Sequence, residues 1–491
     1  MHRSGQTVSE AKFTTQTGLT LDKAEFKDVY VGGRLVIDCA EIRLTQNGSE
    51  TPRVYLSLGY IQVSPEHGVE ARLVCPRDPS DVYDPIAAFV RGNDFTSGVM
   101  IPDSHYYRLE ARDVAGNVWT CPAVDLKRHE WPDAVILTLS CDRIRTEEAS
   151  EVARPYAYLV FLDTLDFPTN MVRTTTVEQG GKLKSSDISR QDSQGVAAGF
   201  QVSYYERKSV PGEKYSEFFA RALEGVTTPS LFQDRMLEAI RFCTATMATP
   251  VMSETVADNV KVIELAKSRP LNNGLVHPPV STSEHGIDGD FYKLFESYFN
   301  YACANADGKD FAPLSSKLGG LFTLKGVWLD TIVLLLGVAV ESVLSEEVFK
   351  TIGKPKKELL EDIKKLVDMV KLAPVEESLV ARVVNAMGNM KSNSAADKLH
   401  ALIEVGALEE EDRKAWKRLR NASAHGTFEI DPEEMQRLLD DVFRLTTIIY
   451  KLVFLRIGYC GKYSNRAAHG WRVDQFDSAK YLAALKANAK A

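Results

Sequence analysis

The sequence predicts an α+β protein of several domains, in which a β-rich N-terminal domain precedes an all-α C-terminal bundle. Residues 1–212 contain short runs of Val, Ile, Tyr and Leu between turn residues, whereas apolar residues from about 213 onward recur at helical spacing. The length of 491 residues also exceeds what one hydrophobic core normally supports. We therefore expect a β-rich domain over 1–212, a helical middle region with linkers over 213–320, a helical domain over 321–475 and a tail over 476–491.

The N-terminal region alternates apolar and polar residues most clearly in Arg34–Leu44 and in Tyr106–Trp119. Within the second run, Asp113–Asn117 supplies a Gly/Asn turn between two strands. Many short strands with turn signals are typical of a sandwich or a rolled-up sheet. The segment 174–195 is polar and rich in Gly and Ser, so we expect a long exposed loop there.

The middle region is expected to be mainly helical. The runs SEFFARALEGV (216–226) and LFQDRMLEAIRFCTATM (231–247) place apolar residues at i, i+3, i+4 and i+7. The segment 268–290 is rich in proline and turn residues and is predicted to be a linker or an active loop, and FYKLFESYFNYACAN (291–305) is predicted to form one more helix.

The region 321–475 has the strongest helical pattern. Its long amphipathic segments are joined by short connections, which favours a bundle of largely antiparallel helices. The segment Trp328–Leu344 is apolar nearly all round and is expected to form the buried centre of that bundle.

Composition narrows the classes of function. A net charge of −8 argues against a protein coated in basic residues, so any nucleic-acid contact requires a local patch. The seven cysteines are widely scattered without a C-x-x-C pair, which supports neither a disulfide framework nor a zinc ribbon. The N-terminus lacks the apolar segment of a secretory signal, and the apolar run Ile332–Val340 is too short to span a bilayer. We expect a cytoplasmic protein with no membrane contact.

One predicted helix near the C-terminus carries many side chains that could bind a ligand or take part in catalysis. It opens with Glu409–Asp412, continues with the basic residues Arg413, Lys414, Lys417, Arg418 and Arg420, and then carries Asn421 and His425 before Gly426. An acidic start and a basic end complement the helix dipole, and a glycine suits the end of a helix, so a purely structural interpretation is available.

The same residues suit RNA cleavage without a metal or cofactor. Histidine can exchange the proton of a ribose 2′-OH, arginine can hold the phosphate, and RNA supplies its own nucleophile. The basic residues Arg413, Lys414, Lys417 and Arg418 would bind the RNA backbone. On a regular helix Asn421, His425 and Arg418 share a face, whereas Arg420 lies roughly 140° from His425. Either Arg420 reaches round the helix or the helix distorts near its end, and the site makes best sense if the helix end distorts and a second protomer completes it.

The segment Arg420-Asn421-Ala-Ser-Ala-His425 resembles the motif of the HEPN superfamily: an Arg, a polar residue, and a His four to six positions on. The tail VFLRIGYCGKYSNRAAHGW and the β-rich region ahead of the bundle resemble ApeA-type abortive-infection proteins. The resemblance implies a homodimeric endoribonuclease that leaves 2′,3′-cyclic phosphates, with Arg420 and His425 catalytic and Asn421 orienting them. It also implies an anti-phage toxin that cuts tRNA or another cellular RNA, is regulated by its N-terminal region and responds to a phage-derived trigger. Arg418 competes with Arg420 as the motif arginine, and the polar residue after Arg420 favours Arg420.

Several other residues are candidates with two interpretations each. Glu341 either pairs with an arginine near the motif or faces solvent, and Arg466 with His469 is interpreted as a tail or interface feature. His277, His285, Asp288 and Asp290 lie in the 268–290 segment, where a solvated loop is favoured over a metal site. Trp119 and Trp131 are assigned to sheet core. The alternative to a nuclease is a non-catalytic dimeric binding or sensor module on a HEPN-like scaffold.

Overall fold

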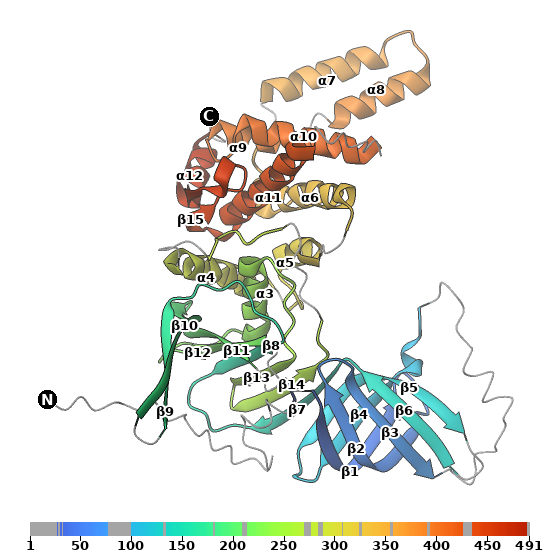
Figure 1. Ribbon diagram of the computed structural model, residues 1–491. Coiled ribbons are helices and arrows are strands. Elements are labelled where there is room, and N and C mark those ends of the chain that lie inside the picture. Colours follow the sequence, from blue (N-terminus) through green and yellow to red (C-terminus); the bar gives the residue numbers. More distant parts are fainter. Residues whose placement is uncertain are drawn as a thin grey trace.

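A computed structural model of the chain describes residues 27, 30–31, 33–76, 100–130, 134–179, 182–208, 214–269, 276–282, 288–306, 308–323, 327–353, 357–389, 393–425 and 435–488. Over these residues the protein is α+β, as predicted. A β-rich N-terminal region contains a six-stranded barrel and further strands, and a helical region follows at the C-terminal side (Figure 1).

The first six strands form the closed barrel, in which every pairing is antiparallel. The strands follow the order β1-β2-β3-β6-β5-β4, and β4 pairs with both β1 and β5, which closes the ring. The rolled-up alternative therefore describes this part of the chain. Alternate residues point inward around a core that includes Trp119, whose indole N–H donates to Asp113 at 3.0 Å. The barrel strands are β1 (Leu35–Gln46), β2 (Val54–Ser64), β3 (Gly68–Pro76), β4 (Tyr107–Asp113), β5 (Val118–Glu130) and β6 (Ala134–Cys141).

Eight further antiparallel strands continue the same hydrogen-bonded sheet beyond the barrel, and this open part is called the second sheet. The link is β5, which pairs with β6 in the barrel and with β7 outside it through Trp119↔Thr146 and Thr120↔Arg145. In sheet order the added strands are β7 (Arg143–Ala149), β14 (Val260–Ala266), β13 (Met252–Ala257), β8 (Tyr156–Phe161), β12 (Lys214–Ala222), β11 (Phe200–Lys208), β10 (Lys182–Ala197) and β9 (Met171–Gln179).

Two sequence predictions in this region are wrong. The segment 174–195, predicted as a loop, lies in the β9–β10 hairpin, where Thr174 pairs with Ile188. Strands pair through backbone hydrogen bonds, which do not require apolar side chains. A polar segment that contains β-branched residues can therefore form a hairpin. The run 216–226, predicted as a helix, contains most of β12, which lies between β8 and β11. A strand buried on both faces has a continuous apolar run that also fits a helical period. Strands β13 and β14 further extend the sheet beyond residue 212.

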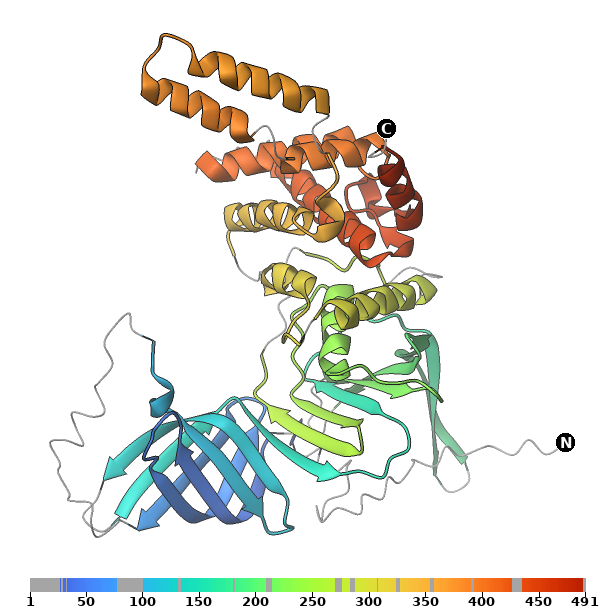
Figure 2. The same cartoon turned by 180° about the vertical axis from the view of Figure 1, so that it is seen from behind.

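Two helices lie between this sheet and the helical bundle. Helices α3 (Phe232–Thr244) and α4 (Asp288–Asn305) confirm the helices predicted there and lie between the sheet and the C-terminal helices in both views (Figures 1 and 2). One continuous apolar cluster runs from Phe218 on β12 through Phe242 and Tyr298 to Phe454 in the bundle. The short elements α5 (Pro313–Leu318) and η2 (Gly319–Thr323) lead from α4 into the bundle.

The C-terminal region is helical with a small sheet inserted. Helix α10 packs against α6 and α11, while α7 and α8 form a hairpin that projects from the bundle (Figures 1 and 2). The prediction of an all-α region is therefore incomplete, because β15 pairs with β16 within it. The helices are α6 (Leu329–Leu344), α7 (Lys357–Lys371), α8 (Glu377–Asn389), α9 (Ala395–Glu404), α10 (Glu410–His425), α11 (Met435–Ile457) and α12 (Ser478–Asn488), with β15 (Cys460–Ser464) and β16 (Val473–Asp477) between the last two.

Helix α6 is only in part the buried centre that its composition predicted. It buries Ile332, Val333, Leu336 and Val340 among others, but Leu334 is 47% exposed and Val338 is 55% exposed. These two residues lie four apart and so share one face of the helix. The bundle leaves an apolar stripe of α6 at its surface.

Candidate functional site

The predicted site lies on α10, which holds its place through one buried face. Ala415, Trp416 and Leu419 are buried against neighbouring helices, and the acidic residues of the first turn complement the helix dipole. The buried Asp412 accepts the backbone N–H of Glu409 at 2.9 Å and a hydrogen bond from Arg444 of α11 at 2.8 Å. The first turn of α10 is thereby fixed, and Lys417 and Arg420 in its second half lie exposed at the surface.

Two of the predicted RNA-binding residues are paired within α10. Arg413 donates to Glu410 with an Nη2–Oε1 distance of 2.5 Å, and Lys414 Nζ lies 3.7 Å from Glu411. The hydrogen bond from Arg413 lowers the pKa of Glu410. Lys414 and Lys417 are exposed, one turn apart along the helix. The structure therefore places Arg413 and Lys414 beside carboxylates of their own helix, and Lys417 at the surface.

Arg418 binds a buried carboxylate of the neighbouring helix α11. Its Nε and Nη2 donate to the two carboxylate oxygens of Asp441 on α11 at 2.9 and 2.6 Å, and Nη2 also lies 2.8 Å from Glu411. These bonds, chiefly the one to Asp441, raise the pKa of Arg418 further above its usual value. A bidentate contact to a buried carboxylate is the arrangement that arginine forms best. Arg418 ties α10 to α11, which favours a structural role for it.

Arg420 lies at the surface, next to a second helix. Its Nε donates to Glu341 of α6, and its guanidinium carbon lies 5.8 Å from the centre of the Trp416 ring. The side chain of Arg420 is 51% exposed. Of the two interpretations left open for Glu341, the structure supports pairing with an arginine of the motif. The carboxylate and the aromatic ring together orient the Arg420 guanidinium at the protein surface.

Asn421 and His425 complete the motif on the same helix. Asn421 is exposed, and the backbone of α10 stays α-helical as far as His425. The side chain of His425 lies outside the described residues, as does Gly426. A regular helix separates the backbone positions of Arg420 and His425 by about 140°. The expected distortion of the helix end is thus not found up to His425.

The exposed stripe of α6 ends at this site. Leu334, Val338 and Glu341 follow each other at intervals of four and three residues, so they share one face of α6. Glu341 is the member that binds Arg420. An apolar surface therefore lies directly beside the motif arginine.

The other candidates serve the packing of the chain. Arg466 is buried, donates to the carbonyl of Pro278 at 2.9 Å and lies 4.9 Å from the Trp471 ring. His277 lies 5.2 Å from the same ring, and its burial, with the nearby Arg466 charge, lowers its pKa. Arg466 thus holds the 276–282 segment against the C-terminal hairpin, and His469 is exposed beside it.

No metal site is found in the part of the chain that the structure describes, where no three His, Cys, Asp or Glu residues are grouped to hold an ion. Asp290 forms an ion pair with Lys293 at 3.5 Å. His285 and the side chain of Asp288 lie outside the described residues, and so does Trp131. Trp119 belongs to the barrel core, as expected.

Comparison of the chain with protein-family models, with curated proteins and with solved structures gives no match. Among the helices that the structure describes, none combines the length and the apolar character needed to cross a membrane.

Proposed function

We propose that the protein is a metal-independent endoribonuclease of the HEPN type, with its active site at the C-terminal end of α10. The observation that carries the proposal is the setting of Arg420. This arginine of the RNASAH motif is exposed at the surface, oriented by Glu341 and Trp416, and is followed on the same helix by Asn421 and His425. Arg418, the competing arginine, is engaged with Asp441.

In the proposed chemistry, Arg420 binds the scissile phosphate and stabilises the charge that develops on it. His425 exchanges the proton of the 2′-OH or of the leaving oxygen, because imidazole titrates near neutral pH. Attack of the 2′-oxygen on phosphorus breaks the bond to the 5′-oxygen and leaves a 2′,3′-cyclic phosphate. Glu341 competes with the phosphate for Arg420, so binding of RNA exchanges one anionic partner for another.

A homodimer fits this chemistry better than a single chain. The regular α10 separates the backbone positions of Arg420 and His425 around the helix axis, and a second copy would supply the partner residue from across a two-fold interface. Leu334 and Val338 offer an apolar surface beside Arg420 on which that copy would pack. Replacing Leu334 by Asp should give monomers in sedimentation analysis and lose RNA cleavage. A cleaving L334D monomer would contradict the dimer.

We infer the RNA-binding residues from their exposure and their partners. Lys414 and Lys417 are exposed on α10 and are the proposed contacts to the phosphate backbone, whereas Arg418 is assigned to the bundle. Arg413 would have to leave Glu410 to contribute. We further propose that the substrate is tRNA or another cellular RNA, and that the β-rich region restrains the nuclease until a phage-derived trigger acts, as in abortive infection.

The test is cleavage of total RNA by the purified full-length protein and by two variants. The proposal expects cuts that persist in EDTA and disappear in both His425→Ala and Arg420→Ala. Lys462→Met, an exposed lysine on β15, is the matched surface control and should cleave like the wild type. Cleavage that survives in His425→Ala, or that EDTA abolishes, would contradict the proposal.

The alternative function is a dimeric binding or sensor module without catalysis. It is favoured by one observation, since the motif arginine already has a carboxylate partner in Glu341. This alternative expects no RNA cleavage with any trigger and the same cellular phenotype for the wild type and His425→Ala. It still expects the Leu334→Asp variant to lose the dimer, so the RNA assay and the cellular phenotype of His425→Ala distinguish the two functions, whereas the oligomeric state does not.

A further inference from the structure

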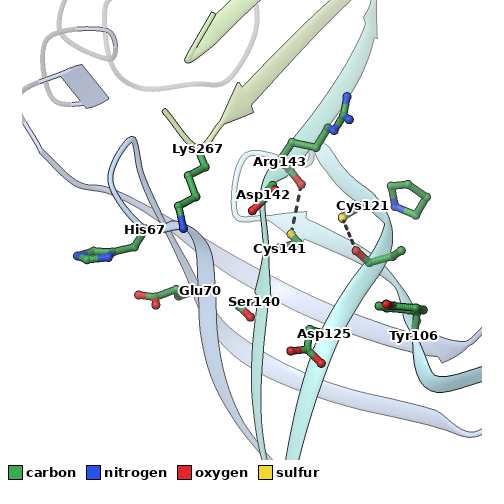
Figure 3. Close-up of a pocket in the computed structure, with 12 residues that line it drawn as sticks. His67, Glu70, Tyr106, Cys121, Asp125, Ser140, Cys141, Asp142, Arg143 and Lys267 are labelled. Carbon is green, nitrogen blue, oxygen red and sulfur yellow. Dashed lines mark hydrogen bonds between the residues drawn. The ribbon is translucent and has the colours of Figure 1, made fainter. Parts of the chain in front are cut away.

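A pocket of about 620 Å³ lies where the chain leaves the barrel for the second sheet (Figure 3). Two free cysteines, Cys121 on β5 and Cys141 at the end of β6, line it together. In Figure 3 the two sulfur atoms face each other. The pocket is also lined by charged and polar side chains: His67, Glu70, Asp125, Ser140, Asp142, Arg143 and Lys267.

The strand register explains why cysteines twenty residues apart meet. Strand β5 pairs with β6 through Asp125↔Ser140 and with β7 through Thr120↔Arg145, so the part of β5 around Cys121 lies beside the turn from β6 to β7. The pairing between β4 and β5 also shifts register just after Cys121. A bulge of this kind redirects side chains and leaves backbone groups outside the ladder.

Each thiol is held by a carbonyl two residues further along the chain. Cys121 Sγ donates to the carbonyl of Ala123 at 3.3 Å, and Cys141 Sγ donates to the carbonyl of Arg143 at 3.2 Å. Cys121 is buried in the barrel wall and Cys141 is half-buried. Both side chains therefore have fixed positions, and the pocket gives a small reagent a route to them.

The surroundings make the two thiols unequal. The neighbouring Cys141 side chain lowers the pKa of Cys121 to about 7 against the effect of burial, with help from the Arg143 charge, while Glu264 opposes it. The neighbouring Cys121 side chain and burial raise the pKa of Cys141. Cys121 therefore ionises more readily than Cys141, and the thiolate is the reactive form of a cysteine.

We propose that Cys121 and Cys141 are an oxidisable dithiol site, at which a hydroperoxide converts the pair to a disulfide. The Cys121 sulfur attacks the peroxide, so that an S–O bond forms, the O–O bond breaks and the peroxide is reduced to an alcohol, or to water for hydrogen peroxide. Cys141 then attacks the Cys121 sulfenic acid, which forms the S–S bond and releases water that carries away the Cys141 proton. Two thiols and one hydroperoxide give one disulfide, one alcohol and one water.

The other cysteines provide the contrast. Cys39, Cys75 and Cys243 are buried, and burial raises the pKa of each thiol, which makes them poor nucleophiles. Cys460 is exposed on β15, far along the chain from the barrel. A disulfide between Cys121 and Cys141 would join β5 to the turn between β6 and β7 and so fix the junction of barrel and sheet.

The test uses the full-length wild-type protein, treated with one equivalent of hydrogen peroxide and then alkylated, digested without reduction and mapped by mass spectrometry. The proposal expects a peptide pair linked through Cys121 and Cys141, with the loss of two hydrogens, that dithiothreitol separates. Cys460→Ser should form the same link, whereas Cys121→Ser should not. An unlinked sulfenic acid at Cys121, or oxidation of Cys460 while both pocket thiols remain alkylatable, would overturn the proposal. Neither result depends on RNA cleavage, so this site and the proposed nuclease can fail separately.

Discussion

Replacing Arg418 by Met should loosen the contact between α10 and α11. The variant removes two hydrogen bonds to Asp441, whose side chain is only 8% exposed, and leaves that carboxylate without its bidentate partner. Hydrogen bonds to charged groups contribute about 1.5–3 kcal/mol, whereas the outer pair with Glu411 adds little in water. We expect a loss of about 2–3 kcal/mol in the free energy of opening this pair of helices.

Hydrogen exchange measured peptide by peptide is the suitable assay, because it reports the opening of α10 and α11 separately from the barrel. A loss of about 2–3 kcal/mol corresponds to exchange that is roughly 30- to 150-fold faster in peptides of these two helices. Lys417→Met removes the same charge from the exposed neighbouring position and should leave exchange unchanged. The double variant R418M/D441L should recover part of the protection, since no buried carboxylate remains.

Two results together would refute the structural role of Arg418. The first is exchange in Arg418→Met that matches Lys417→Met. The second is loss of RNA cleavage in that variant as complete as in Arg420→Ala. Arg418 would then be the motif arginine, and its pairing with Asp441 would be a resting arrangement that RNA displaces.

Three further predictions concern other parts of the molecule. Arg235→Met leaves Glu238 buried without its ion-pair partner and should lower the free energy of unfolding by about 3–5 kcal/mol in chemical denaturation. Gly195→Ala places a Cβ 2.6 Å from the Tyr292 ring and should cost about 1–3 kcal/mol in the same assay. The rate at which iodoacetamide alkylates Cys121 should rise as pH passes through about 7, because the thiolate replaces the thiol above that pKa.

Each of these predictions has a control variant or a result that would contradict it. Gly289→Ala meets no atom within 4 Å and should leave stability unchanged, so an equal loss in both glycine variants would refute the contact argument. If Arg235→Met unfolds at the same midpoint denaturant concentration as the wild type, the buried ion pair between Arg235 and Glu238 does not stabilise the protein as predicted. Cys141→Ala removes the thiol that lowers the pKa of Cys121 and should move the alkylation midpoint of Cys121 to higher pH. An unchanged midpoint would show that another group lowers the pKa.

Local patterns in the sequence predict the fold class and the main helices well. The acidic start and basic end of α10, and the apolar face of α3, are periodic over several turns and need no distant partner to be recognised. Strand β12 and the β9–β10 hairpin are different, since their structure depends on neighbours in the sheet. A doubly buried strand resembles a helix in composition, and a polar hairpin resembles a loop.

The candidate site likewise combines features that are local in the sequence with features that depend on distant contacts. The spacing of charged and polar residues predicts the motif and its helix, but the roles of Arg418 and Glu341 depend on contacts between α10 and two other helices. No local pattern distinguishes an arginine that binds Asp441 from one that faces solvent. Cys121 and Cys141 were likewise uninformative as two of seven scattered cysteines, because the register of β5 with β6 and β7 brings them together.

The most direct test of the central claim is the chemistry of RNA ends left by the purified protein in the presence of EDTA. A metal-independent nuclease built on Arg420 and His425 should leave 2′,3′-cyclic phosphates and 5′-hydroxyls, and His425→Ala should leave none. Cleavage that leaves 5′-phosphates, that requires a divalent metal, or that is undiminished in His425→Ala would contradict the account.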